Sequence, residues 1–141
     1  MRIKIVKPRL QSAALAYRVE PNGRTRVLLV TKKHSRKWGV PKGSAKPYLS
    51  LAENAAKEAF EEAGVIGEVT PGSAGMFRAR KKTTFGEQII EVWVYAMLVT
   101  DCLDEWPEKA QRQTKWVSCR TAARTLNEPV LKGLCRKLER R

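Results

Sequence analysis

The chain has few of the side chains that enzymes most often use as nucleophiles, bases and soft-metal ligands. Among its 141 residues are one histidine, His34, and three cysteines, Cys102, Cys119 and Cys135. No nucleophile motif surrounds His34, which lies in a basic segment and is expected to be solvated. The cysteines are odd in number and lack the pairwise spacing of a metal site, so we expect reduced thiols in a cytoplasmic protein.

Long hydrophobic runs are also missing. No stretch approaches the roughly 20 apolar residues of a membrane-spanning helix, and the apolar run within residues 1–8 is too short for a secretory signal. We therefore expect no membrane partner. No internal repeat, low-complexity tract or linker interrupts the chain, and its length suffices for a buried core. The sequence thus predicts a single domain over residues 1–141.

Acidic residues are scarce relative to basic ones. The chain has 14 Asp and Glu against 28 Lys and Arg, which gives a net charge of +14 and a pI near 10.2. Such a balance favours a polyanionic partner, either nucleic acid or a small molecule dense in phosphate. The alternative is a basic surface that serves only solubility.

Apolar and β-favouring runs predict strands before and after a central helix. Asn22–Gly23 predicts a hairpin between the first two strands. The helix has a capping box, Ser50 followed by Glu53, and a glycine stop at Gly64. Ser118 is expected to cap a short helix, and an amphipathic terminal helix follows it. The pattern indicates one mixed α/β domain. The predicted strands are residues 13–19, 27–31, 38–40, 65–80, 87–100 and 114–117.

Three carboxylates are concentrated near the end of the central helix. Glu58, Glu61 and Glu62 lie within five residues, and offsets of three and four place side chains on one helix face. A divalent cation would turn their mutual repulsion into coordination, and oxygen ligands favour Mg²⁺ or Mn²⁺. The turn 41–43 is of the kind that brings backbone close to a metal or phosphate. An acidic face exposed to solvent is the alternative.

The segment 43–65 resembles the Nudix box, written G-x5-E-x7-R-E-U-x-E-E-x-G-U with U aliphatic. Two positions depart from this pattern, because Leu49 stands where the box has glutamate and Lys57 where it has arginine. Lys57 keeps the charge but not the planar fork of arginine, so weakened or redirected activity is one interpretation. The resemblance extends over nearly the whole chain and implies an α/β/α sandwich with a mixed sheet and a central catalytic helix. The positions that match are Gly43, Glu58, Ala59, Glu61, Glu62, Gly64 and Val65.

The resemblance implies a hydrolase that cleaves phosphoanhydride bonds with Mg²⁺ or Mn²⁺. Glu58, Glu61 and Glu62 would be its catalytic and metal-binding side chains, and the backbone carbonyl of Lys42 a further ligand. Glu58 would also be a candidate base. Such a metal neutralises charge on phosphate oxygens and lowers the pKa of bound water.

Outside the box, the resemblance implies one more acidic ligand and a set of cations for the substrate. An acid from the loop after the long strand often joins the metal site in this family. Glu105 is the first prediction for it and Glu108 the second. A basic tip is predicted at residues 78–82, between the two long strands. Substrate phosphates are expected to bind Lys42, Arg78, Arg80, Lys81 and Lys82, with Lys32, Arg36 and Lys37 as further candidates.

Three functions remain open at this point. Residues 38–43, 104–108 and 115–118 resemble the branch that hydrolyses diphosphoinositol polyphosphates and diadenosine polyphosphates, so the leading hypothesis is a pyrophosphohydrolase of such polyanionic small molecules. Removal of pyrophosphate from the 5′ end of RNA is the second, with the basic surface following the backbone. The third is a catalytically weakened Nudix domain that binds nucleic acid or a nucleotide, which Leu49 and Lys57 would explain.

Overall fold

The computed structural model describes residues 7–139, so most of the short N-terminal apolar run lies outside the described part. Within it there are eight strands and three α-helices, with four strands before the first helix and two consecutive helices at the end, and one 3-10 turn, η1 (Lys109–Gln111). No helix in this part is long and apolar enough to cross a membrane. The elements are β1 (Arg9–Val19), β2 (Thr25–Thr31), β3 (Trp38–Gly39), β4 (Lys42–Ser44), α1 (Leu51–Ala63), β5 (Val65–Val69), β6 (Gly75–Thr83), β7 (Gly86–Cys102), β8 (Thr114–Ser118), α2 (Cys119–Thr125) and α3 (Pro129–Glu139).

The strands form one mixed sheet around β1 and β7. These two strands are parallel, and their register runs from Arg9 opposite Ile90 to Tyr17 opposite Leu98. All other pairings are antiparallel: β2 and β4 pair with β1, β5 and β6 with β7, and β3 and β8 with β2. The predicted hairpin is confirmed, since β1 and β2 are joined by a turn in which Gly23 has φ 84°. The prediction of a mixed sheet is confirmed as well.

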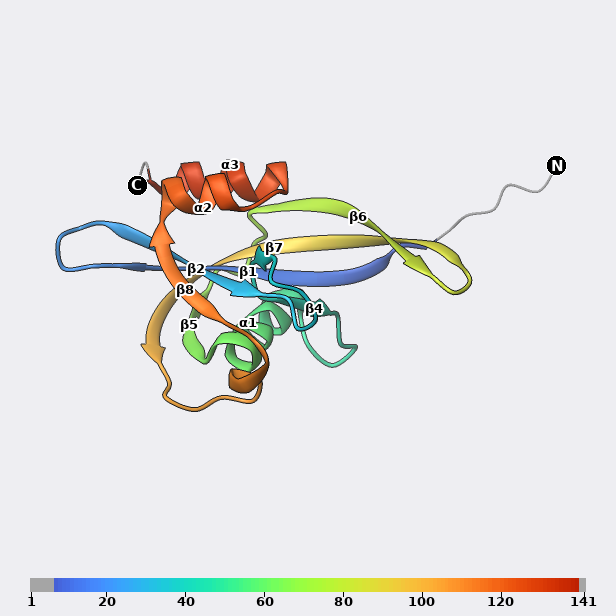
Figure 1. The fold of residues 1–141 in the computed structure, drawn as a ribbon, viewed down its shortest axis with the longest axis horizontal. Coiled ribbons are helices and arrows are strands. Elements are labelled where there is room, and N and C mark those ends of the chain that lie inside the picture. Colours follow the sequence, from blue (N-terminus) through green and yellow to red (C-terminus); the bar gives the residue numbers. More distant parts are fainter. Residues whose placement is uncertain (1–6, 140–141) are drawn as a thin grey trace.

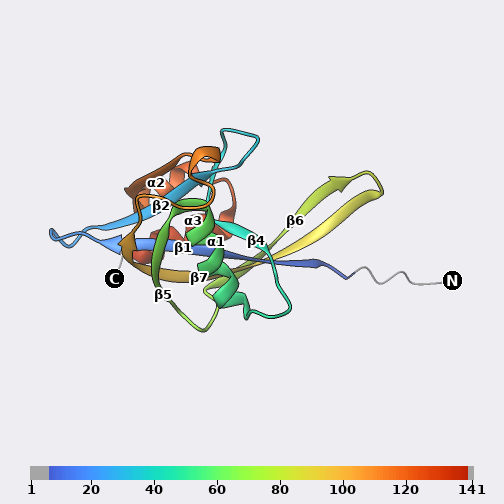
Figure 2. The same ribbon diagram turned by 90° about the horizontal axis from the view of Figure 1, so that it is seen from below.

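Helices cover both faces of this sheet (Figures 1 and 2). Successive residues of a strand point to opposite faces, and β1 shows this plainly. Ala13 and Leu15 pack in the core that includes α2 and α3, whereas Ala14 and Ala16 pack in the core that includes α1. The predicted α/β/α arrangement is therefore confirmed. The cysteines are free thiols, with Cys102 exposed and the other two buried.

Two predicted boundaries were wrong. Residues 65–80 form two strands, β5 and β6, because residues 70–74 leave the sheet at Pro71–Gly72. The basic segment 78–82 is part of β6 rather than a hairpin tip, and the turn lies beyond it at Thr84 and Phe85. The ladder extends this far because charges of opposite sign face each other across it. The ion pairs are Arg78 with Glu91 and Arg80 with Glu87, each at 3.3 Å.

The caps of α1 agree with the prediction, and its C-terminal end is covered by the loop 103–108. Ser50 and Glu53 form the capping box, and Gly64 ends the helix with φ 66°. The last carbonyls of a helix lack partners within it. Here the loop supplies them: Leu103 N donates to Gly64 O (2.8 Å), and Glu108 N donates to Glu61 O (2.9 Å). The position of this loop is thus fixed by the end of α1.

Replacing Gly64 by alanine should destabilise the fold. The residue has a positive φ, and an added Cβ would lie 2.3 Å from the ring of Trp106, which covers the helix end. A non-glycine residue in this conformation costs about 1–3 kcal/mol, and the contact with Trp106 adds to that. Urea denaturation of Gly64→Ala measures the loss. Gly72→Ala is the control, because no atom lies within 4 Å of its added Cβ; an equal loss in both variants would contradict the prediction.

Candidate active site

The carboxylates of Glu58 and Glu62 are buried where α1 meets the sheet. Their relative exposures are 8% and 3%, and their spacing of four residues places them one turn apart on the same face. Gly43 on β4 makes this burial possible. A Cβ at that position would lie 2.3 Å from the carboxyl carbon of Glu58, so only glycine leaves room for the carboxylate. Glu61 lies toward solvent, and Lys57 Nζ donates to its Oε1 at 2.5 Å.

Hydrogen bonds hold β4 and its preceding turn against α1. Ala14 N donates to Pro41 O at 2.9 Å, and β4 pairs with β1. Asn54 lies fully buried one turn before Glu58, and its Nδ2 donates to Ser12 Oγ (2.9 Å) and Gly43 O (3.4 Å). The backbone N–H of Lys42 donates to the Glu62 carboxylate, which lowers the pKa of that group. The turn 41–43, which was expected to approach a metal or phosphate, therefore lies against the buried carboxylates.

Burial dominates the electrostatics of these groups. It raises the pKa of Glu62 to about 8; Arg112 opposes this increase, while Glu58 and Glu108 add to it. Burial also raises the pKa of Glu58, and Glu61 raises it further, against a lowering by Lys57. The raised pKa values mean that the ionised forms of both carboxylates are disfavoured in this position, so a positive charge placed beside them would stabilise those forms.

The residues fit a hard divalent cation. The donors available around Glu58 and Glu62 are oxygens, the ligands that Mg²⁺ and Mn²⁺ prefer. Residues 7–139 contain no group of three or more His, Cys, Asp or Glu side chains close enough together to hold an ion. The carboxylate of Glu61 is paired with Lys57 Nζ at 2.5 Å. The fit rests on the buried pair, on the oxygen chemistry and on the space that Gly43 leaves for Glu58.

The two predicted loop acids lie in different environments. The side chain of Glu105 is 86% exposed and pairs with Lys109. The side chain of Glu108 is 17% exposed, its Oε1 accepts from Arg112 Nε at 2.9 Å, and its charge raises the pKa of both buried glutamates. Of the two, Glu108 is the one directed toward the site.

Arg112 links the loop, the sheet and α1. Its guanidinium, 14% exposed, contacts Glu108, lies 3.6 Å from Glu62, and donates through Nη1 to Thr31 O at 2.9 Å. Sequence reasoning missed this residue. The spacing of four residues between Glu108 and Arg112 is a signal that would have indicated a pair. Asn54 and Trp106 were missed too, because their roles depend on contacts distant in sequence.

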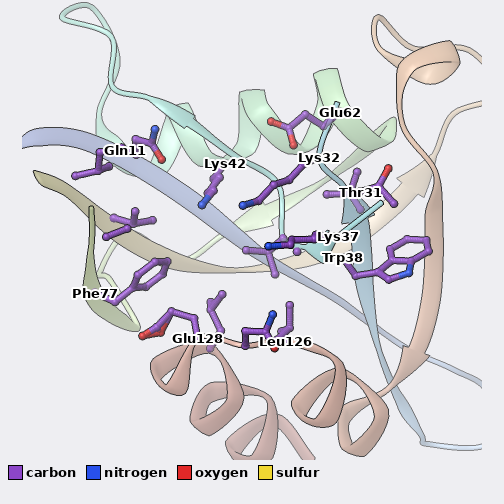
Figure 3. Close-up of a pocket in the computed structure, with 18 of the residues that line it drawn as sticks. Gln11, Thr31, Lys32, Lys37, Trp38, Lys42, Glu62, Phe77, Leu126 and Glu128 are labelled. Carbon is purple, nitrogen blue, oxygen red and sulfur yellow. The ribbon is translucent and has the colours of Figure 1, made fainter. Parts of the chain in front are cut away.

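A cavity of about 620 Å³ opens beside Glu62 (Figure 3). Its lining comes mainly from β2, β3, β4, β6, β7, the segment before α3 and α3 itself. Of the predicted phosphate-binding residues, Lys42, Arg80 and Lys81 line it, and Arg78 and Lys82 do not. Arg36 lines a smaller neighbouring pocket of about 260 Å³. Trp38 lines the large cavity, with Lys115 Nζ 4.2 Å from its ring centroid. The cations that line the large cavity are Lys32, Lys33, Lys37, Lys42, Arg80, Lys81 and Arg112.

Comparison with known proteins connects this site to a family. A sequence profile described as "NUDIX domain" matches residues 9–137. Nudix hydrolase 12, mitochondrial, of Arabidopsis thaliana is 30% identical over 100 residues, which are 68% of this chain and 49% of that protein. Diphosphoinositol polyphosphate phosphohydrolase 3-beta of Bos taurus is 27% identical over 135 residues, which are 92% of this chain and 77% of that protein. The chain spans about half the length of the plant relatives it matches.

Solved structures agree on the fold. The NUDIX domain of Shewanella oneidensis NrtR, crystallised with ADP ribose, superposes with a TM-score of 0.70 at 15% identity. The match covers 96% of this chain and 89% of that chain. The resemblance inferred from residues 43–65 is thus confirmed at the level of the family.

Without metal, the protein should lose stability as the pH rises from about 5 to 8. The folded-state pKa of Glu62, about 8, exceeds its ordinary value of 4.5, so the folded state binds the proton more tightly than the unfolded state across this window. The free energy of unfolding falls by at most ~1.4 kcal/mol per pH unit from this group. Glu62→Gln removes this pH-dependent contribution. The free energy of unfolding of the variant, relative to that of the wild type, should therefore increase with pH.

Urea denaturation at several pH values in a chelator measures this difference. Glu68→Gln, which changes an exposed acid on β5, should follow the wild type. Adding MgCl₂ should reduce the advantage of Glu62→Gln, because a cation favours the ionised carboxylate. Parallel stability curves for the wild type and Glu62→Gln would contradict the prediction.

Proposed function

This chain belongs to the Nudix family, and on that premise we propose that it is a metal-dependent pyrophosphohydrolase of a polyphosphate-rich small molecule. The observation that carries the proposal is the buried pair Glu58 and Glu62, of which Glu62 lines a cavity that is rich in cations. The cations of the cavity would attract phosphate, but the carboxylates alone would repel it. A divalent cation held by the carboxylates would remove that repulsion. The reaction is hydrolysis of a phosphoanhydride bond.

The residues that would hold Mg²⁺ or Mn²⁺ are those at the junction of β4 and α1. They are Glu58, Glu61 and Glu62, with the backbone carbonyl of Lys42. When bound, the metal supplies charge neutralisation on phosphate oxygens and a more acidic water. Glu58 is also suited to accept a proton, since burial raises its pKa above the ordinary value of a glutamate. Lys57, which stands where the box has arginine, pairs with Glu61 and would orient its carboxylate.

Glu108 is our proposal for the additional acid, in place of the more exposed Glu105. Its side chain is 17% exposed, and the hydrogen bond from its backbone N–H to Glu61 O ties it to the catalytic helix. Arg112 orients its carboxylate. Glu105 pairs with Lys109 on the solvent side of the loop.

The cations of the cavity would bind the substrate phosphates. Lys32, Lys37 and Lys42 lie between Glu62 and the rest of the cavity (Figure 3). Diphosphoinositol polyphosphates and dinucleoside polyphosphates both carry the charge density that this lining and the net charge of +14 suit. The name of the bovine relative supports the first substrate and the branch resemblance supports both.

The weakened, binding-only domain is the second candidate, and one contact favours it. Lys57 Nζ lies 2.5 Å from Glu61 Oε1, so a predicted metal ligand already has a cationic partner. Such a domain would bind nucleotide or nucleic acid with strongly salt-dependent affinity and yield no product with any metal. Hydrolysis of triphosphorylated RNA belongs in the same substrate panel as a separate outcome.

We further propose that residues 1–141 form one Nudix domain, of which the family match covers 9–137. A cytoplasmic location stays a prediction, and the names of several plant relatives include "mitochondrial".

Glu61→Gln should lower metal-dependent phosphate release by at least about a hundredfold, because a lost metal ligand removes several kcal/mol of charge stabilisation. Release is measured with Mg²⁺ or Mn²⁺ on diphosphoinositol polyphosphates, dinucleoside polyphosphates and triphosphorylated RNA. Glu68→Gln is the matched control. Full-rate release by Glu61→Gln would refute the metal assignment, and no release by the wild type from any substrate would favour the binding-only domain.

Replacing each loop acid by glutamine in turn tests which of them binds the metal. Glu108→Gln should weaken Mn²⁺ binding and lower kcat by about tenfold or more, the range for residues that hold or orient a metal ligand. Glu105→Gln should stay within about twofold, in line with an exposed ion pair. Mn²⁺ affinity from electron paramagnetic resonance, measured alongside kcat, gives the answer. The reverse order of effects would restore Glu105 as the ligand.

A further inference from the structure

The large cavity has two chemically different ends. Figure 3 shows Lys32 and Lys42 near Glu62, and Phe77, Leu126 and Glu128 along the opposite side, next to the C-terminal helices. The opposite side is built from apolar side chains of β6, β7 and α3. Those lining the cavity there are Phe77, Ile90, Val92, Leu126 and Leu131.

One acid stands in this apolar part of the cavity. Glu128 lies directly before α3 and is half-buried. One of its oxygens, Oε2, accepts from Val130 N at 3.0 Å, and its carbonyl accepts from Lys132 N at 3.0 Å. No salt bridge in residues 7–139 involves Glu128, so its other carboxylate oxygen is left to accept a hydrogen bond from a ligand.

This end of the cavity is unsuited to a fully phosphorylated ring. Such a ring carries charge on every side, and burying charge against apolar side chains without a partner is costly. The carboxylate of Glu128 would repel its phosphates as well. The cations that line the cavity on this side, Arg80 and Lys81, lie toward the β6–β7 hairpin, and Arg80 is paired with Glu87 and 76% exposed.

A nucleobase has the opposite properties. Its two faces are apolar and pack against aliphatic and aromatic side chains. Its exocyclic amino group donates hydrogen bonds, and a carboxylate offers only acceptors. With the base in the apolar end, the attached phosphates extend toward Lys42 and the buried glutamates.

We propose that the substrate carries an amino-bearing nucleobase, which binds in the apolar end of the cavity with its amino group donating to Glu128. The inference rests on the proposed function and selects nucleoside polyphosphates over diphosphoinositol polyphosphates. Glu128 is then a specificity-determining residue. Its orientation is set by the bond to Val130 N, which holds one oxygen and presents the other to the base.

The test compares diadenosine tetraphosphate with diinosine tetraphosphate, which has a carbonyl in place of each amino group. The wild type should show a KM about tenfold to a hundredfold lower for the adenosine compound, the range of a hydrogen bond to a charged acceptor. Calorimetry with methylene-bridged analogues in a chelator gives the same ratio as a binding constant without turnover.

Glu128→Gln should reverse this preference. The amide oxygen can keep the bond from Val130 N, so the fold is retained and the NH₂ group is presented to the base, where it pairs with the carbonyl of hypoxanthine. Glu68→Gln makes the same change of charge on β5, away from the cavity, and should keep the wild-type ratio.

Three outcomes would overturn the inference. They are equal constants for the two dinucleotides in the wild type, an unchanged ratio in Glu128→Gln, and a higher kcat/KM for diphosphoinositol pentakisphosphate than for diadenosine tetraphosphate. Each of these leaves the proposed hydrolase activity standing. Absence of hydrolysis of every substrate would instead refute the proposed function, and the calorimetric ratio would still decide the role of Glu128.

Discussion

The carboxylates of Glu58 and Glu62 are buried between α1 and the sheet, and the other features of the site depend on that burial. Burial raises both pKa values, so the ionised forms of the two carboxylates are disfavoured without a nearby positive charge. In the proposed function, a hard divalent cation would stabilise these ionised forms at the junction of β4 and α1. Only glycine fits at position 43, because the carboxylate of Glu58 occupies the space that a side chain would need. Asn54, on the same helix as Glu58, donates a hydrogen bond to the carbonyl of Gly43.

The C-terminal end of α1 extends this constraint to a distant part of the chain. The free carbonyls of the last turn accept from the loop 103–108, and Trp106 packs over Gly64. This contact brings Glu108 to the buried pair and places Arg112 between the loop, Thr31 and Glu62. A helix terminus that needs hydrogen-bond partners thus positions an acid and a cation at the site.

The two sides of the cavity differ in the chemical groups that they could bind. Cations near Glu62 suit phosphates, and the apolar wall with Glu128 suits a planar base. The wall exists because β6 and β7 continue as a hairpin past the centre of the sheet, while α2 and α3 cover the same face (Figure 1). In our proposals, catalysis and selectivity thus depend on opposite sides of one cavity. Substitutions in the apolar wall could then change substrate selectivity without any change in the segment 43–65.

The sequence by itself determined the family, the mixed α/β fold, the caps of α1 and the hairpin at Asn22–Gly23, because these depend on local spacing, turn chemistry and periodicity. It did not determine which loop acid faces the site, which basic residues line the cavity, or that residues 78–82 belong to a strand. Those were decided by tertiary structure. Glu105 and Glu108 differ little in sequence, and only the docking of their loop on α1 buries one and exposes the other. Likewise, only the tertiary structure places Lys42 and Glu128, which are distant in sequence, on the lining of one cavity.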